Sequence, residues 1–183
     1  MLFRSVFGHA AQISEIAKIC KKYKIILIED AAEAIGSYYN NKHLGTFGDF
    51  GIISFNGNKI VTTGGGGAIL TSNIKSYRKL LKLVLVNKEK HQFEYRYKSV
   101  GYNYKMPSLN ASLGISQLNN LKKIISNKRK IFQFYKKIFQ EIEGIYILEQ
   151  PKNSVSNYWL NTIVLKKKYK SHKNTIIKSL IKN

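Results

Sequence analysis

Apolar and polar residues follow two different periods along the chain, and the alternation of these periods predicts a mixed α/β fold. Apolar residues recur at three- and four-residue steps, as on one face of a helix, in three stretches: residues 10–23, 73–86 and 107–144. Short apolar runs rich in strand-forming residues are typical of buried strands and occur at residues 25–28, 52–55 and 68–70. Within the longest helical stretch, Ser126 and Asn127 have only moderate helix propensity and predict a break near its middle.

The segment from Gly51 to Thr71 joins two of these predicted strands and has an unusual composition. It contains a polar turn with Lys59, a pair of threonines and four consecutive glycines, Gly64–Gly67. Glycine tolerates positive φ and lets the backbone approach a flat or anionic ligand closely. A lysine on a turn between buried strands is kept from bulk water, and desolvation is one way in which lysines become Schiff-base nucleophiles. The alternative is an ordinary lysine that extends to solvent beside a glycine-rich loop.

Two acidic residues follow the first predicted strand. Glu29 and Asp30 come directly after residues 25–28 and precede the sequence AAEAIG. Open α/β sheets bind ligands beyond the carboxyl ends of their strands, so a carboxylate at this point is a candidate site residue. Pyridoxal phosphate requires a carboxylate beside its ring nitrogen and a lysine that forms an imine with its aldehyde. Asp30 and Lys59 are therefore candidates for these two roles.

Composition excludes several classes of protein. The chain has 183 residues, of which 44% are hydrophobic, so it can form a sizeable core. No apolar run approaches the ~20 residues that cross a bilayer, and the first residues lack the pattern of a secretory signal. The single cysteine, Cys20, excludes an internal disulfide and a cysteine metal cluster. These features predict a cytoplasmic protein without membrane contact and without a bound metal.

The net charge of +21 raises the possibility of nucleic-acid binding. The lysines are spread along the chain, however, and arginine, which suits base and phosphate recognition, is scarce. We therefore expect no nucleic-acid partner, although a positive field would attract an anionic substrate. Among the histidines, we expect His43 in an exposed loop and His9 in a local structural hydrogen bond, and we assign no role to His91 or His172.

Three motifs in a fixed order, EDAAEAIGS, GTFGDFGIISFNGNK and TTGGGGAILTSN, resemble those of the DegT/DnrJ-type sugar aminotransferases. These enzymes use pyridoxal phosphate and have the aspartate-aminotransferase (type I) fold. The resemblance covers roughly residues 6–121 and implies an α/β chain with a partial type I fold. Residues 1–121 would form the C-terminal half of the large cofactor-binding domain, and residues 122–183 a linker helix and an incomplete small domain. This second part would contain strands near residues 145–149 and 158–165, so that the chain would begin and end inside the fold.

The resemblance also implies a role for each matching residue. Lys59 would attach the cofactor and act as general base and acid, and Asp30 would keep the ring nitrogen protonated. Ser54 matches a phosphate-binding hydroxyl, and Asn103 matches a residue that crosses a dimer interface to the partner's cofactor phosphate. Glu33 matches a position near the ring hydroxyl where the family often has an amide, so its role stays open.

The implied reaction transfers an amino group from glutamate to a keto carbon, C4, of a 4-keto-6-deoxy nucleotide sugar in a homodimeric enzyme. The motifs look most like those of the bacillosamine and legionaminic acid routes, which serve bacterial surface glycans or glycoproteins. A non-catalytic remnant, or one piece of a split aminotransferase gene, is the alternative, and we expect the chain alone to be inactive. The family's sugar dehydratases carry histidine in place of the lysine, and Lys59 argues against that activity.

Overall fold

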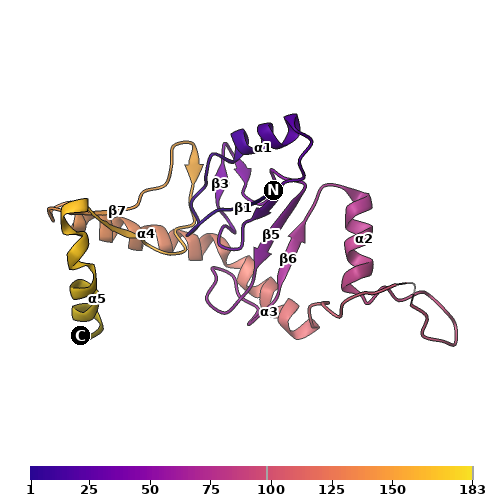
Figure 1. Cartoon of the computed structure of the whole chain (residues 1–183). Helices are drawn as coiled ribbons and strands as arrows, with labels where there is room; N and C mark the ends of the chain where they lie inside the picture. The colour runs from indigo at the N-terminus through magenta and orange to yellow at the C-terminus, as the bar shows by residue number, and fades with distance from the viewer. Residues whose placement is uncertain (98, 183) are drawn as a thin grey trace.

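The computed structural model describes residues 1–97 and 99–182, in which a four-stranded sheet is followed by a long pair of helices (Figure 1). The sheet has the order β1-β2-β5-β6, with the bounds Leu2–Arg4, Ile28–Asp30, Phe50–Ser54 and Gly67–Leu70. Strands β1, β2 and β5 are parallel, and β6 runs antiparallel to β5. The three parallel strands therefore end at one edge of the sheet, and the loops that follow them meet there.

Helix α1 (Ile13–Lys22) packs its apolar face into the main core, where Ile13 and Cys20 are buried with Leu27. The helix expected over residues 10–23 is thus present, with a later start. The strand expected over residues 25–28 is displaced, because the chain first turns through Lys24 in the left-handed region (φ 53°). Residues 25 and 26 are exposed, and β2 begins only at Ile28.

The two acidic residues of β2 have different functions because neighbouring side chains on a strand point to opposite faces. Glu29 is 3% exposed, and its carboxylate accepts the main-chain N–H groups of Gly45 (2.9 Å) and Gly48 (2.6 Å). It therefore holds the loop before β5 in place. Asp30, the last residue of the strand, takes no part in these contacts.

Residues 38–43 form a hairpin instead of the loop that the sequence predicts. Strands β3 (Tyr38–Tyr39) and β4 (Lys42–His43) pair through a two-residue turn in which Asn40 and Asn41 have positive φ, as a type I′ turn requires. A third strand, β8 (Ser154–Val155), pairs with the other side of β3. This pairing brings a segment that follows the long helices back to the first half of the chain.

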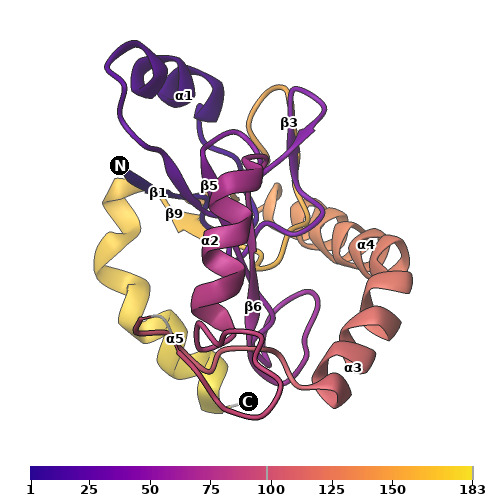
Figure 2. The same ribbon diagram turned by 90° about the vertical axis from the view of Figure 1, so that its right-hand side faces the viewer.

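Three helices connect the sheet to the last part of the chain. Helix α2 (Ile74–Val84) lies beside the sheet, next to β6 (Figure 2), and is capped by the side chain of Asn73. Helices α3 (Ser108–Asn119) and α4 (Leu121–Phe139) meet at Asn120. The break predicted at residues 126 and 127 is wrong, because Ile124 and Ile125 pack against a buried cluster and hold this part of α4 helical despite its low propensity.

The last part of the chain lies at the far end of α4 from α2 (Figure 1). It consists of an antiparallel pair, β7 (Ile145–Ile147) and β9 (Ile163–Leu165), followed by the 3-10 turn η1 (Lys167–His172) and α5 (Lys173–Lys182). The first predicted strand is confirmed, and the second covers only the end of residues 158–165. Among the described residues, no helix is long and apolar enough to cross a membrane.

Candidate active site

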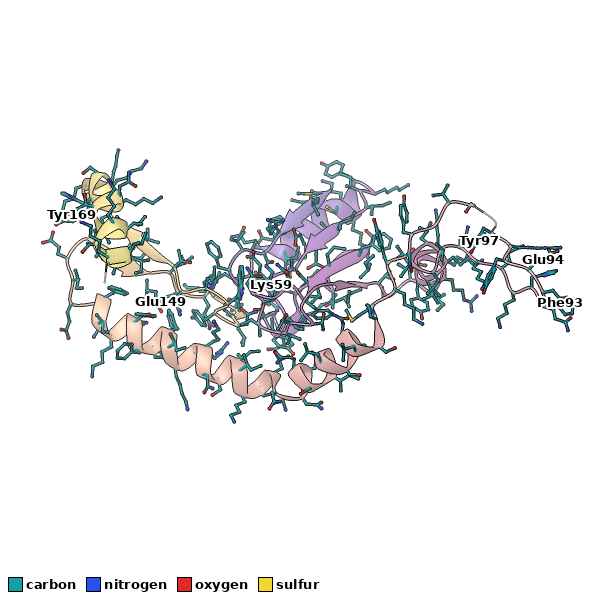
Figure 3. All side chains as sticks on the ribbon, turned by 90° about the horizontal axis from the view of Figure 1, so that it is seen from below. Lys59, Phe93, Glu94, Tyr97, Glu149 and Tyr169 are labelled. Carbon is teal, nitrogen blue, oxygen red and sulfur yellow. The ribbon has the colours of Figure 1, made fainter. Side chains whose placement is uncertain are left out.

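Lys59 lies at the edge where the parallel strands end (Figure 3). It closes a short turn after β5, in which the Lys59 N–H donates to the carbonyl of Asn56 (3.0 Å). The Asn56 N–H donates in turn to the hydroxyl of Ser54, the last residue of the strand (3.3 Å). The Lys59 side chain is only 12% exposed, so the predicted shielding of this lysine from solvent is confirmed.

Among the described residues, two groups contact the Lys59 amine. The Glu33 carboxylate lies 3.5 Å from Nζ, and the centroid of the Trp159 ring lies 3.9 Å from the same atom. The other oxygen of Glu33 accepts the N–H of Phe7 (2.7 Å). A carboxylate and an aromatic face both attract a positive charge, so these contacts hold the Lys59 amine in a partly desolvated position.

Asp30 is held at the same edge by contacts to both carboxylate oxygens. Oδ2 forms an ion pair with the guanidinium of Arg4 (2.6 Å), and Oδ1 accepts the N–H of Ala32 (3.2 Å). Arg4 and Asp30 are directly opposite each other in the β1–β2 register, which explains the pairing. The sequence did not indicate Arg4, because three residues before a loop are too few to reveal a strand.

The structure brings four of the five predicted site residues to this edge. Asp30, Glu33, Ser54 and Lys59 all lie in or directly after β2 and β5. Asn103 is different: it is exposed and pairs with Leu85 through one isolated bridge. Within residues 1–97 and 99–182, no hydrogen bond or ion pair connects it to the other four.

The glycine run after Lys59 forms a tight turn that leads into β6. Gly64 and Gly66 have positive φ (78° and 92°), as the sequence predicted. The Thr62 hydroxyl donates to the carbonyl of Phe55 (3.2 Å) and accepts the N–H of Gly64 (2.9 Å). From α3, the Asn110 amide donates to the carbonyl of Thr63 (2.6 Å). The turn is thus fixed from both sides next to the lysine.

Trp159 reaches Lys59 because the segment before it is anchored in the first half of the chain. Asn157 is fully buried, and its side-chain amide donates to the carbonyls of Glu33 and Ile35 (both 2.9 Å). Its side-chain oxygen accepts the N–H of Trp159 (2.8 Å), and its own N–H donates to the hydroxyl of Ser37 (2.9 Å). No local sequence pattern indicates the contacts of Asn157 to Glu33, Ile35 and Ser37, which span more than 100 residues.

Replacing Asn157 by leucine should therefore lower the free energy of unfolding strongly. The change leaves two buried carbonyls and one N–H without partners, at about 1–3 kcal/mol each, so we expect a loss of about 3–5 kcal/mol. Denaturant unfolding measures it. Asn161 provides the matched control, because its buried side-chain oxygen has no hydrogen-bond partner among the described residues, and Asn161→Leu should cost little. Equal losses for the two variants would contradict the role of Asn157.

Two histidines lie near this region without contacting Lys59. His43 is half-buried on β4, where Nε2 accepts the N–H of Gly36 (2.8 Å) and Nδ1 donates to the carbonyl of Leu44 (2.5 Å), so the exposed loop position is wrong. His9 is buried with its ring edge-on to Tyr158, and neither ring nitrogen has a hydrogen-bond partner in the described chain, so its expected hydrogen bond is also wrong. Burial lowers the pKa of both histidines, which favours the neutral imidazole.

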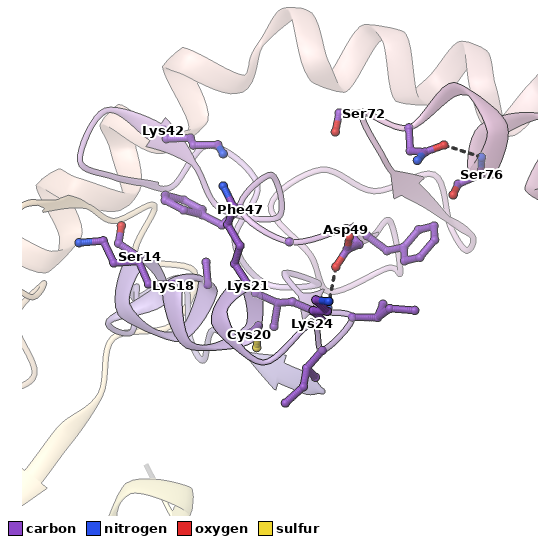
Figure 4. A pocket seen from close by; sticks show the side chains of 17 residues that line it. Ser14, Lys18, Cys20, Lys21, Lys24, Lys42, Phe47, Asp49, Ser72 and Ser76 are labelled. Atoms are coloured by element: carbon purple, nitrogen blue, oxygen red, sulfur yellow. Dashed lines mark hydrogen bonds between the residues drawn. The ribbon is translucent and has the colours of Figure 1, made fainter.

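A cavity of about 860 Å³ lies at the opposite edge of the sheet, between α1 and the start of α2 (Figure 4). Its lining includes Lys21, Lys42 and Asp49, and Asp49 accepts the N–H of Leu27 (2.8 Å). Asp49 directly precedes β5, whereas Asp30 ends the parallel strand β2. The two aspartates therefore lie at opposite ends of the parallel strands, and this cavity is separate from the Lys59 site.

Comparisons with known proteins agree with this geometry. A model of the DegT/DnrJ/EryC1/StrS aminotransferase family matches residues 2–183. GDP-perosamine synthase of Vibrio cholerae is 34% identical over 184 residues, which cover 97% of this chain and 48% of the relative. Helicobacter pylori PseC, described as an aminotransferase involved in the biosynthesis of pseudoaminic acid, superimposes with a TM-score of 0.92 at 27% identity, covering 98% of this chain and 48% of PseC.

A second similar structure contains the cofactor. The E. coli GDP-4-keto-6-deoxy-D-mannose-3-dehydratase with bound hydrated PLP has a TM-score of 0.87 and 27% identity, covering 99% of this chain and 50% of the dehydratase. The chain thus spans about half the length of the relatives it matches.

The sheet, its lysine-bearing edge and these likenesses define a partial type I pyridoxal-phosphate transferase fold, which confirms the fold class predicted from the sequence. The chain belongs to the DegT/DnrJ/EryC1/StrS aminotransferase family.

Proposed function

We propose that this chain provides the lysine-bearing part of a pyridoxal-phosphate-dependent enzyme that transfers an amino group from glutamate to a nucleotide sugar. The position of Lys59 carries this proposal: its shielded amine lies beside a carboxylate at the edge where the parallel strands end. The residues at this edge fit the cofactor, because an amine, the anionic Asp30 and the hydroxyl of Ser54 suit its aldehyde, its ring nitrogen and its phosphate.

Each of these residues has a distinct task. The cofactor, when bound, supplies an electron sink for negative charge at the carbon that carries the migrating amino group. The Lys59 amine removes a proton from that carbon as a general base. It then delivers the proton to a second carbon of the reacting molecules as a general acid. Asp30 keeps a positive charge on the ring nitrogen, and Ser54 donates its hydroxyl to the phosphate. Glu33 orients Lys59 through the contact at 3.5 Å.

Asn103 has its task in a second subunit. It is exposed and bonded to none of the other predicted site residues of its own chain as far as the structure describes it. This supports a homodimer in which Asn103 extends to the cofactor phosphate of the partner.

The proposed acceptor is a 4-keto-6-deoxy nucleotide sugar, aminated at C4. The names of two relatives support a nucleotide sugar: one is a GDP-perosamine synthase, and the other acts on GDP-4-keto-6-deoxy-D-mannose. The net charge of +21 favours an anionic diphosphate. The second of these relatives is a dehydratase, but Lys59 stands where such enzymes would carry histidine, so we favour amino transfer.

The proposal makes the chain one part of an enzyme, and we expect residues 1–183 to be inactive alone and to act as one piece of a larger site. The apolar side of α2 supports it, because Ile74, Tyr77 and Leu81 are between 43% and 58% exposed and the helix has no buried residue. Adding pyridoxal phosphate, glutamate and the sugar to the purified chain tests this expectation, because turnover by the chain alone would contradict it.

Borohydride reduction tests the assignment of Lys59 directly. We expect the purified protein, incubated with pyridoxal phosphate and reduced, to carry one pyridoxyl group on the peptide that contains Lys59. The amine of Lys59 is shielded from water, whereas most of the other lysines are exposed, so that water can hydrolyse an imine formed on them. Peptide mapping by mass spectrometry provides the measurement, and the same reaction after Lys59→Met provides the control. Labelling that persists in this variant, or that is spread over surface lysines, would contradict the proposal.

A further inference from the structure

Trp159 is the only tryptophan of the chain, and it contacts the lysine turn twice. The face of its ring lies 3.9 Å from the Lys59 amine, and its indole N–H donates to the carbonyl of Asn58, the preceding residue (2.7 Å). The residue is 8% exposed. Water is thus largely excluded from this cation–π contact, and such contacts strengthen when they are desolvated.

The contact belongs to a closed network of four residues, in which each residue contacts the next. Lys59 contacts Glu33, Glu33 accepts the N–H of Phe7, and the ring of Phe7 lies 6.4 Å from that of Trp159. Each member is therefore held by two neighbours. The Lys59 amine is the member whose charge changes in the proposed reaction.

Trp159 joins this network from a distant part of the chain. Asn157 fixes the segment before it, the Ser156 hydroxyl donates to the carbonyl of Gly8 (2.9 Å), and β8 pairs with β3. From α4, the Lys128 amine donates to the carbonyl of Trp159 (3.2 Å). The segment after α4 thus determines the position of the Trp159 side chain next to Lys59.

We propose that Trp159 is a positioning residue for Lys59, and the proposal rests on the function proposed above. The ring face and Glu33 both attract a positive charge. They hold the amine when it is protonated and let it move when it has given up the proton. Trp159 would therefore keep the general acid in place and return the amine to one position after each proton transfer.

Tryptophan fluorescence tests this contact without any cofactor, because Trp159 is the source of the emission when the protein is excited at a wavelength that tyrosine does not absorb. A cation against the ring changes the emission, so Lys59→Met, which keeps the length of the side chain and removes the charge, should shift its intensity. Lys42→Met is the matched control, since Lys42 lies over another ring, that of Phe47 (4.7 Å), and should leave the emission unchanged. Identical emission of the wild type and Lys59→Met would overturn the proposal.

The rate of cofactor fixation tests the consequence. We expect Trp159→Leu to slow the borohydride-trapped labelling of Lys59 at least tenfold and Trp159→Phe, which keeps an aromatic face, to retain most of the rate. Phe132→Leu is the control for lost packing, because Phe132 is buried and stacks on Tyr158 (4.0 Å). It should lower the thermal unfolding midpoint without changing the labelling rate.

The proposed function and the positioning role of Trp159 can be refuted separately. If the wild type fixes no cofactor at Lys59, the proposed function is wrong, and the emission of Lys59→Met still decides whether the amine lies on the ring. If the wild type is labelled and Trp159→Leu is labelled equally fast, only the positioning role is wrong.

Discussion

Replacing Asp30 by asparagine should lower the turnover of amino transfer at least about 100-fold, which corresponds to about 2.7 kcal/mol in activation free energy. In the proposed function the Asp30 carboxylate keeps a positive charge on the ring nitrogen of the cofactor, and a neutral amide cannot replace that negative charge. The variant also leaves the Arg4 guanidinium, now 2.6 Å from Oδ2, without its counter-ion beside the ring. A nearby cation disfavours protonation of the ring nitrogen further.

Two comparisons separate this loss of turnover from unfolding of the variant. Asp30→Asn should still be labelled at Lys59 by pyridoxal phosphate and borohydride, because the lysine turn does not depend on the carboxylate. Asp49→Asn makes the same chemical change at an aspartate that also accepts a main-chain N–H but lies at the other end of the strands, and it should keep normal turnover. Steady-state rates of the complete enzyme with glutamate and the keto sugar decide the matter. Near-normal turnover of Asp30→Asn would rule out the role.

The sequence predicted the part of the site that lies close together along the chain. Asp30 and Ser54 are the last residues of β2 and β5, and Glu33 and Lys59 follow these strands within a few residues. Since parallel strands end at the same edge, knowing the strands is enough to bring these residues together. Helix α1 and strands β5 and β6 lie close to their predicted bounds, whereas β2 begins later than predicted.

The sequence could not predict the groups that hold this site in place. Trp159 contacts the lysine turn across 101 residues, and Asn157 binds the carbonyl of Glu33 across 124. The return of their segment depends on the pairing of β8 with β3, two strands of two residues each, which carry no periodic signal. Arg4 was missed for a similar reason, because its partner is determined by strand register and not by local sequence.

Replacing Lys59 by alanine should reduce turnover by about 10²–10⁴-fold, the range over which a positioned general acid or base contributes. The change removes the amine that moves the proton and the point where the cofactor is attached. It also leaves a space between the Glu33 carboxylate and the face of Trp159, which attracted the ammonium before. A small amine such as ethylamine, added at high concentration, should bind there as a cation and restore part of the rate as its free base.

The rescue identifies Lys59 as the proton carrier. Among several small amines of similar size, the restored rate should increase with basicity, because proton transfer follows Brønsted behaviour. Lys42→Ala serves as the matched control: this lysine also lies over an aromatic ring, that of Phe47, but on β4, outside the site, so its loss should change neither the rate nor the response to amines. Normal turnover of Lys59→Ala would refute the catalytic role of the lysine. A loss that no amine relieves would show that Lys59 attaches the cofactor without moving the proton.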